Sequence, residues 1–189
     1  MTALALCLII FLDLVLVIFL VLFLVFMLDS LVKGHDLPTS KKTIKQLIKI
    51  ILKHKPEAVN FYDLGCGRGT VALAIKKELP QLEVRGTDYN AIRIFFAKLK
   101  SFFFRRKIDF KKQDLFKIGL QNADIVYTYL WYDLMPPLEK KLQSELKTGA
   151  LVVTNTSKFP NWQPVEIINT RTKIPKLADF ETLFVYKKE

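Results

Sequence analysis

The sequence predicts an α/β protein in which a mostly parallel, seven-stranded sheet carries helices on both faces and follows an apolar N-terminal helix. Apolar runs of strand length alternate with helix-period segments from residue 58 onward, as in a chain of β-α-β units. Three of the seven glycines lie within residues 65–69, between a predicted strand and a predicted helix. Residues 1–32 contain no Lys or Arg. The 189 residues leave room for one domain and one extra element.

The first 28 residues carry a single charge, that of Asp13. A membrane-spanning helix needs about 20 apolar residues, and this segment exceeds that length. A cleaved signal peptide would begin with basic residues and end at small ones, whereas this segment has no basic residue and ends in FMLDS (26–30). We therefore expect a retained transmembrane anchor over residues 1–32. Asp13 either pairs with a partner in the bilayer, or is protonated or near the interface and shifts the span toward residues 14–28.

Lysines follow the apolar segment at positions 33, 41, 42, 45 and 49. Because positive flanks remain in the cytoplasm, we expect a single-pass membrane protein whose body lies on the cytoplasmic side. That body, residues 33–189, carries a formal charge of +13, against +11 for the whole chain. The charge suits anionic lipid or an acidic protein partner, and nucleic acid is not expected as a partner. Two cysteines and two histidines form no zinc spacing, so no metal is expected.

The body begins with a linker and a basic amphipathic helix, residues 33–54, in which Ser40 caps a helix over 41–53. That helix packs on the core, lies on lipid, or does both. The following domain, residues 55–189, contains predicted strands at 58–64, 82–87, 108–112, 123–130, 150–156, 165–170 and 181–187, the last two as an antiparallel hairpin. Predicted helices span 69–79, 90–104 and 133–147.

The glycines follow the first strand in the run DLGCGRG (63–69). Glycine there permits a tight turn and brings the backbone close to a ligand at the start of the next helix. The residues expected to bind a cofactor at this loop are Asp63, Gly65, Cys66, Gly67 and Gly69. Cys66 fits the loop as a small side chain and is not expected to act as a nucleophile.

Asp88 ends the second strand, 19 residues after Gly69, where a carboxylate can accept both ribose hydroxyls. The alternative is an N-cap of the helix that starts near Asn90. Dinucleotide sites share this acid, but they favour G-x-G-x-x-G and have no use for a carboxylate such as Asp63 beside a pyrophosphate. A ligand that carries an ammonium and a sulfonium can pair with such a carboxylate. The pattern therefore favours S-adenosylmethionine over NAD.

Asp114 follows the third strand, where the adenine amino group would need an acceptor. Its alternative role is a turn acid that caps the short segment after it. Tyr89, which follows Asp88, and Leu115, which follows Asp114, are expected to bind the cofactor as well.

With Asp63–Gly69, Asp88 and Asp114 in alternating strands and helices, residues 55–187 resemble a class I S-adenosylmethionine-dependent methyltransferase with its Rossmann-like sheet. A closer resemblance is to the membrane-anchored protein-lysine methyltransferases related to the ATP synthase c-subunit lysine N-methyltransferase. It is carried by the N-terminal helix and by the segments Pro38-Thr39, YDLMPPLEKKL (132–142) and FPNWQP (159–164). The resemblance implies methylation of a protein lysine.

Methyl transfer from a sulfonium needs alignment of the nucleophile and the methyl group, without a covalent intermediate. Aromatic faces can hold cationic reactants, and ligands bind at the carboxyl ends of such strands. We therefore expect Tyr129 and Trp131 to be catalytic residues that line the substrate channel, unless they are core aromatics. Residues expected at the substrate are Pro38, Thr39, Tyr132 and Trp162, the last of which could instead fill the sheet edge.

Three hypotheses for function follow. The first is a membrane-anchored protein-lysine methyltransferase, and the second is a methyltransferase for a lipid or another apolar small molecule. The third is a non-enzymatic membrane module that keeps a cofactor-binding fold.

Overall fold

The computed structural model describes residues 3–32, 38–170 and 181–189, and the chain divides into two compact units, Met1–Leu37 and Pro38–Glu189. The first unit contains α1 (Ala3–Val32), a single helix. Within it, Ala3–Met27 has a mean hydropathy of 3.4 and is long and apolar enough to cross a membrane. The apolar helix predicted from the sequence is therefore present.

The second unit contains the alternating strands and helices that the sequence predicts. In chain order these are α2 (Lys41–His54), β1 (Asn60–Leu64), α3 (Thr70–Glu78), β2 (Glu83–Asp88), α4 (Ala91–Phe103), β3 (Asp109–Lys112), the 3₁₀ turn η1 (Leu115–Lys117), β4 (Ile125–Thr128), the 3₁₀ turn η2 (Tyr132–Leu134), α5 (Met135–Glu145), β5 (Leu151–Asn155), β6 (Glu166–Asn169) and β7 (Thr182–Lys187).

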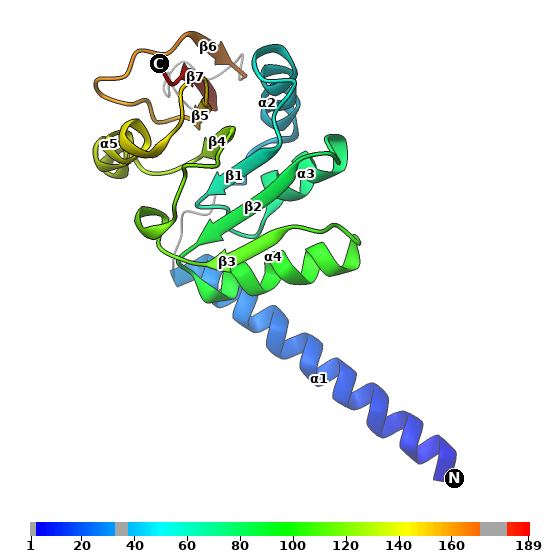
Figure 1. Cartoon of the computed structure of the whole chain (residues 1–189). Helices are drawn as coiled ribbons and strands as arrows, with labels where there is room; N and C mark the ends of the chain where they lie inside the picture. Colours follow the sequence, from blue (N-terminus) through cyan, green and yellow to red (C-terminus); the bar gives the residue numbers. More distant parts are fainter. Residues whose placement is uncertain (1–2, 33–37, 171–180) are drawn as a thin grey trace. The chain divides into compact units, whose positions relative to one another are not determined.

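The strands form one seven-stranded sheet in the order β3-β2-β1-β4-β5-β7-β6 (Figure 1). The first five strands of the chain run parallel, and β7 runs antiparallel to both β5 and β6. The predicted mostly parallel sheet with a closing hairpin is confirmed. Because β1 lies between β2 and β4, the chain order reverses there, and ligands bind outside the carboxyl ends of strands at such a point.

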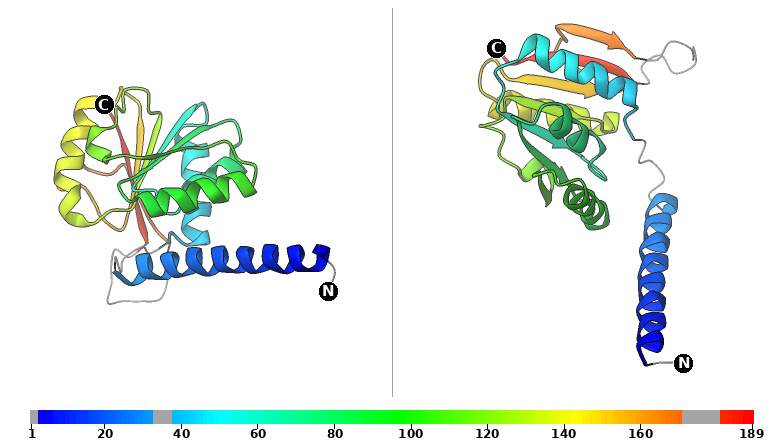
Figure 2. Two further views of the ribbon diagram at one scale, coloured as in Figure 1. Left: turned by 90° about the horizontal axis from the view of Figure 1, so that it is seen from below. Right: turned by 90° about the vertical axis from the view of Figure 1, so that its right-hand side faces the viewer.

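Helices cover both faces of the sheet, as Figures 1 and 2 show. On one face, α2, α3 and α4 bury a cluster that includes Leu47, Ile75 and Ala97. On the other face, α5 buries a second cluster that includes Leu138 and Leu142. The parallel strands are thus apolar on both sides, which explains why they appear in the sequence as continuous apolar runs.

The basic helix α2 is part of the core. Ser40 accepts a hydrogen bond from the backbone N–H of Thr43 and caps the helix, as predicted. Ile44, Leu47 and Ile51 are buried in the cluster with α3. Of the two packing alternatives weighed from the sequence, the structure therefore shows the contact with the core.

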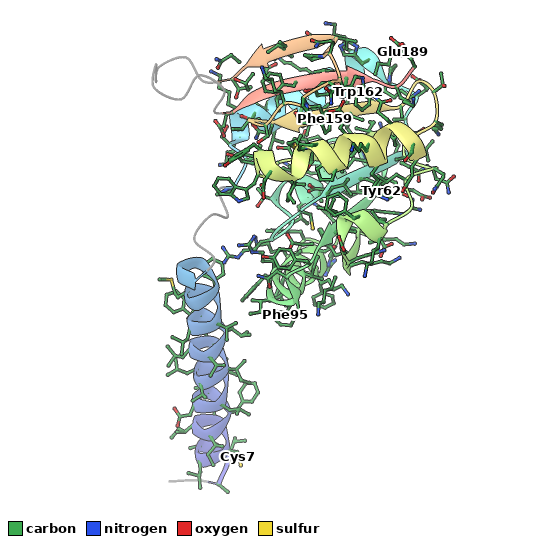
Figure 3. The ribbon with its side chains drawn as sticks, turned by 90° about the vertical axis from the view of Figure 1, so that its left-hand side faces the viewer. Cys7, Tyr62, Phe95, Phe159, Trp162 and Glu189 are labelled. Atoms are coloured by element: carbon green, nitrogen blue, oxygen red, sulfur yellow. The ribbon has the colours of Figure 1, made fainter. Side chains whose placement is uncertain are left out.

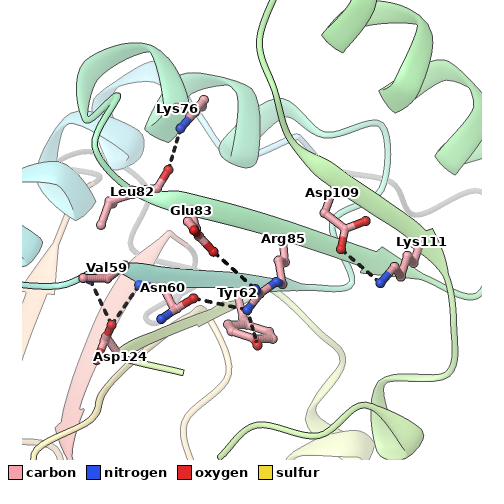
Figure 4. A network of polar contacts seen from close by, with 10 residues as sticks. All are labelled: Val59, Asn60, Tyr62, Lys76, Leu82, Glu83, Arg85, Asp109, Lys111 and Asp124. Carbon is pink, nitrogen blue, oxygen red and sulfur yellow. Dashed lines mark hydrogen bonds and ion pairs between the residues drawn. The ribbon is translucent and has the colours of Figure 1, made fainter. Parts of the chain in front are cut away.

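Polar contacts join neighbouring strands at the amino-end edge of the sheet, where the parallel strands begin (Figure 4). The Asp124 carboxylate accepts hydrogen bonds from the backbone N–H groups of Val59 and Asn60 at 2.9 and 2.8 Å, and Lys147 lies 2.6 Å from its other oxygen. Burial acts to raise the pKa of Asp124, but the Lys147 ammonium and the two N–H groups outweigh it and lower the pKa to about 2. These contacts hold the start of β4 against β1.

The burial of α2 predicts a stability difference between two leucines of the same helix. Leu47 is fully buried and Leu52 is exposed, so Leu47→Ala should lower the free energy of unfolding by about 2–5 kcal/mol, and Leu52→Ala by less than about 0.5 kcal/mol. Urea unfolding followed by the fluorescence of Trp131 and Trp162 measures both. Equal, small effects would show that α2 is not part of the cooperative core.

Candidate active site

The glycine loop turns sharply between β1 and α3. Gly65, Gly67 and Gly69 have φ values of 76°, 53° and 75°, in the left-handed region that favours glycine. The N–H groups of Gly65 and Cys66 both donate to the carbonyl oxygen of Thr87, at 2.9 Å, which joins the loop to β2. A Cβ atom on Gly65 would lie 2.6 Å from the end of the Leu130 side chain, which would then have to shift.

Asp88 connects this loop to the start of α4. Its Oδ2 accepts a hydrogen bond from the Gly67 N–H at 3.0 Å, and its Oδ1 accepts one from the Asn90 N–H at 2.8 Å. The N-cap of α4 is Asn90, whose side chain accepts hydrogen bonds from the backbone N–H groups of Ile92 and Arg93. The capping role considered for Asp88 therefore belongs to Asn90. Each carboxylate oxygen can accept two hydrogen bonds, so these contacts are compatible with ribose hydroxyls.

Asp63 is a buried carboxyl at the end of β1. Its Oδ2 accepts a hydrogen bond from the Ala72 N–H in the first turn of α3, at 3.2 Å. Burial raises the pKa of Asp63 to about 7; the Ala72 hydrogen bond opposes the rise, and the charge of Asp88 adds to it. A carboxyl with so high a pKa is poorly compensated, and a cationic group beside it would favour the ionised form.

The acid after β3 has the capping role that the sequence left open. Asp114 is exposed, and its Oδ1 accepts the N–H of Phe116 at 2.9 Å, which caps η1. The N–H of its neighbour Gln113 donates to the carbonyl oxygen of Asp88 at 3.0 Å, so this turn adjoins the end of β2. Leu115 is half-buried, and Tyr89 is exposed.

Aromatic residues follow β4 at the same edge of the sheet. Tyr129 is half-buried against the cluster of α2, α3 and α4. Trp131 and Tyr132 are exposed, by 55% and 76%. Tyr129 therefore has a packing role as well as a place at the edge, while Trp131 and Tyr132 present their rings to solvent.

A hydrogen-bond network that the sequence did not reveal lies beside Asp63. Tyr127, in register with Asp63 on the neighbouring strand, is fully buried. Its hydroxyl lies 2.9 Å from the Thr39 hydroxyl, and the Asn155 side-chain amide donates to it at 3.3 Å. Ser40 N–H donates to Glu181 Oε1 at 2.9 Å. The segment after Pro38 is thus fixed to the carboxyl ends of β4 and β5 and to the start of β7.

The end of β5 is a strained corner. Thr156 has a φ of 69°, which is rare for a β-branched residue. Its hydroxyl accepts the N–H of Glu181 at 3.0 Å, and its own N–H donates to the Thr182 carbonyl at 2.8 Å. Such strain persists only where the surroundings enforce it. The Thr156 hydroxyl also donates to Asn155 Oδ1 at 3.2 Å, which connects this corner to the residue that contacts Tyr127.

Trp162 lies away from this edge. Its ring stacks on Phe159 at 5.6 Å between centroids and contacts Tyr186 at 5.3 Å (Figure 3). Tyr186 is in register with Val152, near the start of β5, whereas the site lies at the other ends of the parallel strands. The structure therefore groups Trp162 with the packing of the α5 face and does not bring it together with Tyr129 and Trp131.

The residues present fit S-adenosylmethionine. The loop offers backbone without Cβ atoms, Asp88 is placed at its side, and the buried Asp63 matches a cationic amino group. Within residues 3–32, 38–170 and 181–189 no group of three metal-ligating side chains was found. The fold and this edge define a class I S-adenosylmethionine-dependent methyltransferase.

Residues 63–166 match the family described as the ANTKMT methyltransferase domain, and the chain belongs to that family. A protein-lysine N-methyltransferase of Saccharolobus islandicus is 27% identical over 134 residues, which cover 70% of this chain and 82% of the relative. The ATP synthase c-subunit lysine N-methyltransferase of Xenopus laevis is 27% identical over 135 residues, which cover 69% of this chain. The match spans only 57% of the Xenopus protein's length.

Among solved structures, the RNA methyltransferase of Salinibacter ruber in complex with S-adenosyl-L-homocysteine has a TM-score of 0.69. It is 18% identical, and the match covers 80% of this chain and 93% of the other. This likeness is one of fold, and it agrees with the sheet order described above.

The raised pKa of Asp63 predicts a pH-dependent stability. Above pH 4 the unfolded chain loses this proton, whereas the folded protein keeps it until about pH 7. The contribution of Asp63 to the free energy of unfolding is therefore fully present below pH 4 and is lost as the pH rises to about 7. Asn does not titrate. The free energy of unfolding of Asp63→Asn, minus that of the wild type, should rise by a few kcal/mol from pH 4 to pH 8. Urea titrations across this range measure it, and a constant difference would contradict the raised pKa.

Proposed function

We propose that this chain is a membrane-anchored protein-lysine N-methyltransferase. The observation that carries the proposal is the family match, because one stretch contains the glycine loop, Asp88 and the aromatic segment after β4. The names of the two relatives above specify lysine methylation, in one case of a protein of the ATP synthase. Both points favour a lysine side chain as the methyl acceptor.

The cofactor would lie along the carboxyl ends of β1, β2 and β3. In this proposal Gly65, Cys66, Gly67 and Gly69 form its backbone cradle, and Asp88, with Tyr89 beside it, receives the ribose. Asp63 faces the amino group, and the turn of Asp114 and Leu115 adjoins the adenine. When bound, S-adenosylmethionine supplies the methyl group as part of a sulfonium.

The acceptor lysine must reach the site in its neutral form, although a lysine in water has a pKa near 10.4. Desolvation among aromatic rings lowers that pKa, and their faces attract the ammonium before it loses its proton. We assign this role to Tyr129 and Trp131, with Tyr132 at the entrance. Pro38 and Thr39 would border the channel, since Thr39 is fixed to Tyr127 beside Asp63. Trp162 would support the fold from the α5 face.

The proposal places α1 across a bilayer, with residues 38–189 on the cytoplasmic side. The length and composition of Ala3–Met27 support a span, and the lysines that follow support this orientation. An enzyme held at a membrane meets lysines of membrane proteins at high local concentration. Membrane proteins are therefore the substrate class that we expect.

The proposal is tested by methyl transfer in reconstituted vesicles. The full chain, given radiolabelled S-adenosylmethionine and membrane proteins from cells that lack it, should label protein, and acid hydrolysis should release methyl-lysine. Asp88→Ala should weaken cofactor binding at least tenfold in calorimetry, because it removes acceptors for charge-assisted and hydroxyl hydrogen bonds. Asp114→Ala, on the exposed turn, is the milder comparison.

Three outcomes would contradict parts of the proposal. Label in the lipid extract and not in protein would favour the lipid methyltransferase. Label in protein at residues other than lysine would refute the assigned acceptor. Undiminished binding by Asp88→Ala would refute the role of that carboxylate.

The exposed ring of Trp131 gives a prediction about the acceptor. Trp131→Ala should raise the KM for the protein substrate or lower kcat by about tenfold or more, and leave cofactor binding within about twofold, because we assign the ring to the acceptor lysine and not to the cofactor. Trp131→Phe, which keeps an aromatic face, should restore most of the activity. Steady-state kinetics with Ile167→Ala as the control, an exposed apolar residue on β6, would show whether the loss is specific to the channel.

A further inference from the structure

Helix α4 carries apolar side chains on the face that points away from the protein. Its inner face, Ile94, Ala97 and Ser101, is buried against β2 and β3. On the outside, Phe95, Phe102 and Phe103 are exposed by 49%, 78% and 70%. The C-cap Phe104 and the first-turn Ile92 are exposed as well.

A surface helix of a soluble domain normally has one apolar stripe and one polar face. In α4 the outer residues Ile92, Phe95 and Phe102 repeat at helical spacing and continue into Phe103 and Phe104. These rings lie outside the buried cluster on this side of the sheet. The helix contributes only side chains of its inner face, Ile94 and Ala97, to the buried residues of that cluster. A contiguous apolar patch of this kind marks a surface for a partner or a membrane.

The charge around the patch is mostly positive. Residues 91–107 contain six of the 29 basic residues, five of the 15 phenylalanines and no acid. Lys98, Arg105 and Lys107 are exposed beside the rings. Together with Ser101, Phe102, Arg106 and the single acid Asp109 they line an open hollow of about 620 Å³. Four basic side chains against one acid leave the hollow with a net positive charge, which suits an anionic headgroup.

The composition distinguishes among possible occupants. Single-stranded nucleic acid is held by aromatic platforms in a basic groove, whereas here the rings project outward from a convex helix. Phenylalanine lacks the polar tip of Tyr or Trp, so these side chains gain most in a fully apolar environment. Basic residues that flank such rings match anionic phospholipid, which attracts each by about 1 kcal/mol.

We propose that the outer face of α4, with Lys98, Arg105 and Lys107, is a peripheral binding surface for an anionic phospholipid bilayer. The rings enter the headgroup boundary, and the three basic side chains contact phosphates. The surface lies in the second unit and adds a membrane contact separate from α1. The inference shares with the proposed function only the premise that the chain works at a bilayer.

The test uses residues 38–189, which contain every residue of the two hydrophobic clusters and lack α1. This unit should sediment with vesicles of phosphatidylcholine and phosphatidylserine, and less with phosphatidylcholine alone. The double variant Phe102→Ser, Phe103→Ser should weaken binding at least tenfold for each ring removed. Replacement of Lys98, Arg105 and Lys107 by Gln should cost about fivefold for each charge. The matched control is Val165→Ser with Ile167→Ser, which removes two exposed apolar side chains at β6.

Circular dichroism checks that each variant is folded. Because the assay measures vesicle binding and not methyl transfer, its result can be interpreted even if the proposed function is wrong. For the full chain in the same vesicles, with Cys7→Ser, a polarity-sensitive dye at Phe103→Cys should shift to the blue, and one at Ile167→Cys should not. The inference is overturned if the wild type does not bind anionic vesicles, or if the phenylalanine variant binds as the control does. It is also overturned if RNA binds more tightly than vesicles and loses affinity with the same variant.

Discussion

The carboxylate of Asp88 is the contact on which the site depends. One of its oxygens receives the N–H of Gly67, and the other receives the N–H of Asn90. A single side chain at the end of β2 therefore fixes the glycine loop and the start of α4 together. The loop in turn determines where α3 begins, because Gly69 is its N-cap. Without this contact the left-handed Gly67 would lose its anchor to β2, and backbone freedom is greatest at glycine. The loop structure thus rests on the same carboxylate to which we assign the ribose of the cofactor.

Two buried acids at opposite ends of the parallel strands have pKa values shifted in opposite directions. At the amino edge, Asp124 has Lys147 and two backbone N–H groups, and its pKa is lowered to about 2. At the carboxyl edge, Asp63 has one backbone N–H among the contacts described above, and its pKa is raised to about 7. A fully compensated acid stabilises the fold, whereas a poorly compensated one is suited to a ligand that brings positive charge. The difference agrees with our proposal that the cofactor binds at the carboxyl ends of the strands.

The sequence predicted the sheet well because its signals were local. Strand-length apolar runs, the glycine loop and the spacing to Asp88 all depend on residues near one another in the chain. The network of Thr39, Tyr127 and Asn155 was missed, since its members are 88 and 28 residues apart and a tyrosine within an apolar strand looks like core. Tyr127 is indeed core by burial, and only the contact of its hydroxyl shows a second role. For Trp162 the sequence left two roles open, at the substrate or in filling the sheet edge. The register of Tyr186 places the contacts of Trp162 near the amino ends of the parallel strands, which a sequence pattern could not show.

Periodicity alone also could not reveal the outer face of α4. The predicted helix 90–104 has apolar residues on two sides, and a sequence pattern does not say which side meets the sheet. The structure decides this, because the small side chains of Ala97 and Ser101 allow close packing on β2 and β3 and leave phenylalanines outside. An exposed Phe gains nothing from water, so folding alone does not account for four exposed rings beside six basic residues. Such a surface is explained by an apolar boundary with negative charge. A bilayer provides both, and α1 independently has the length and composition to span one.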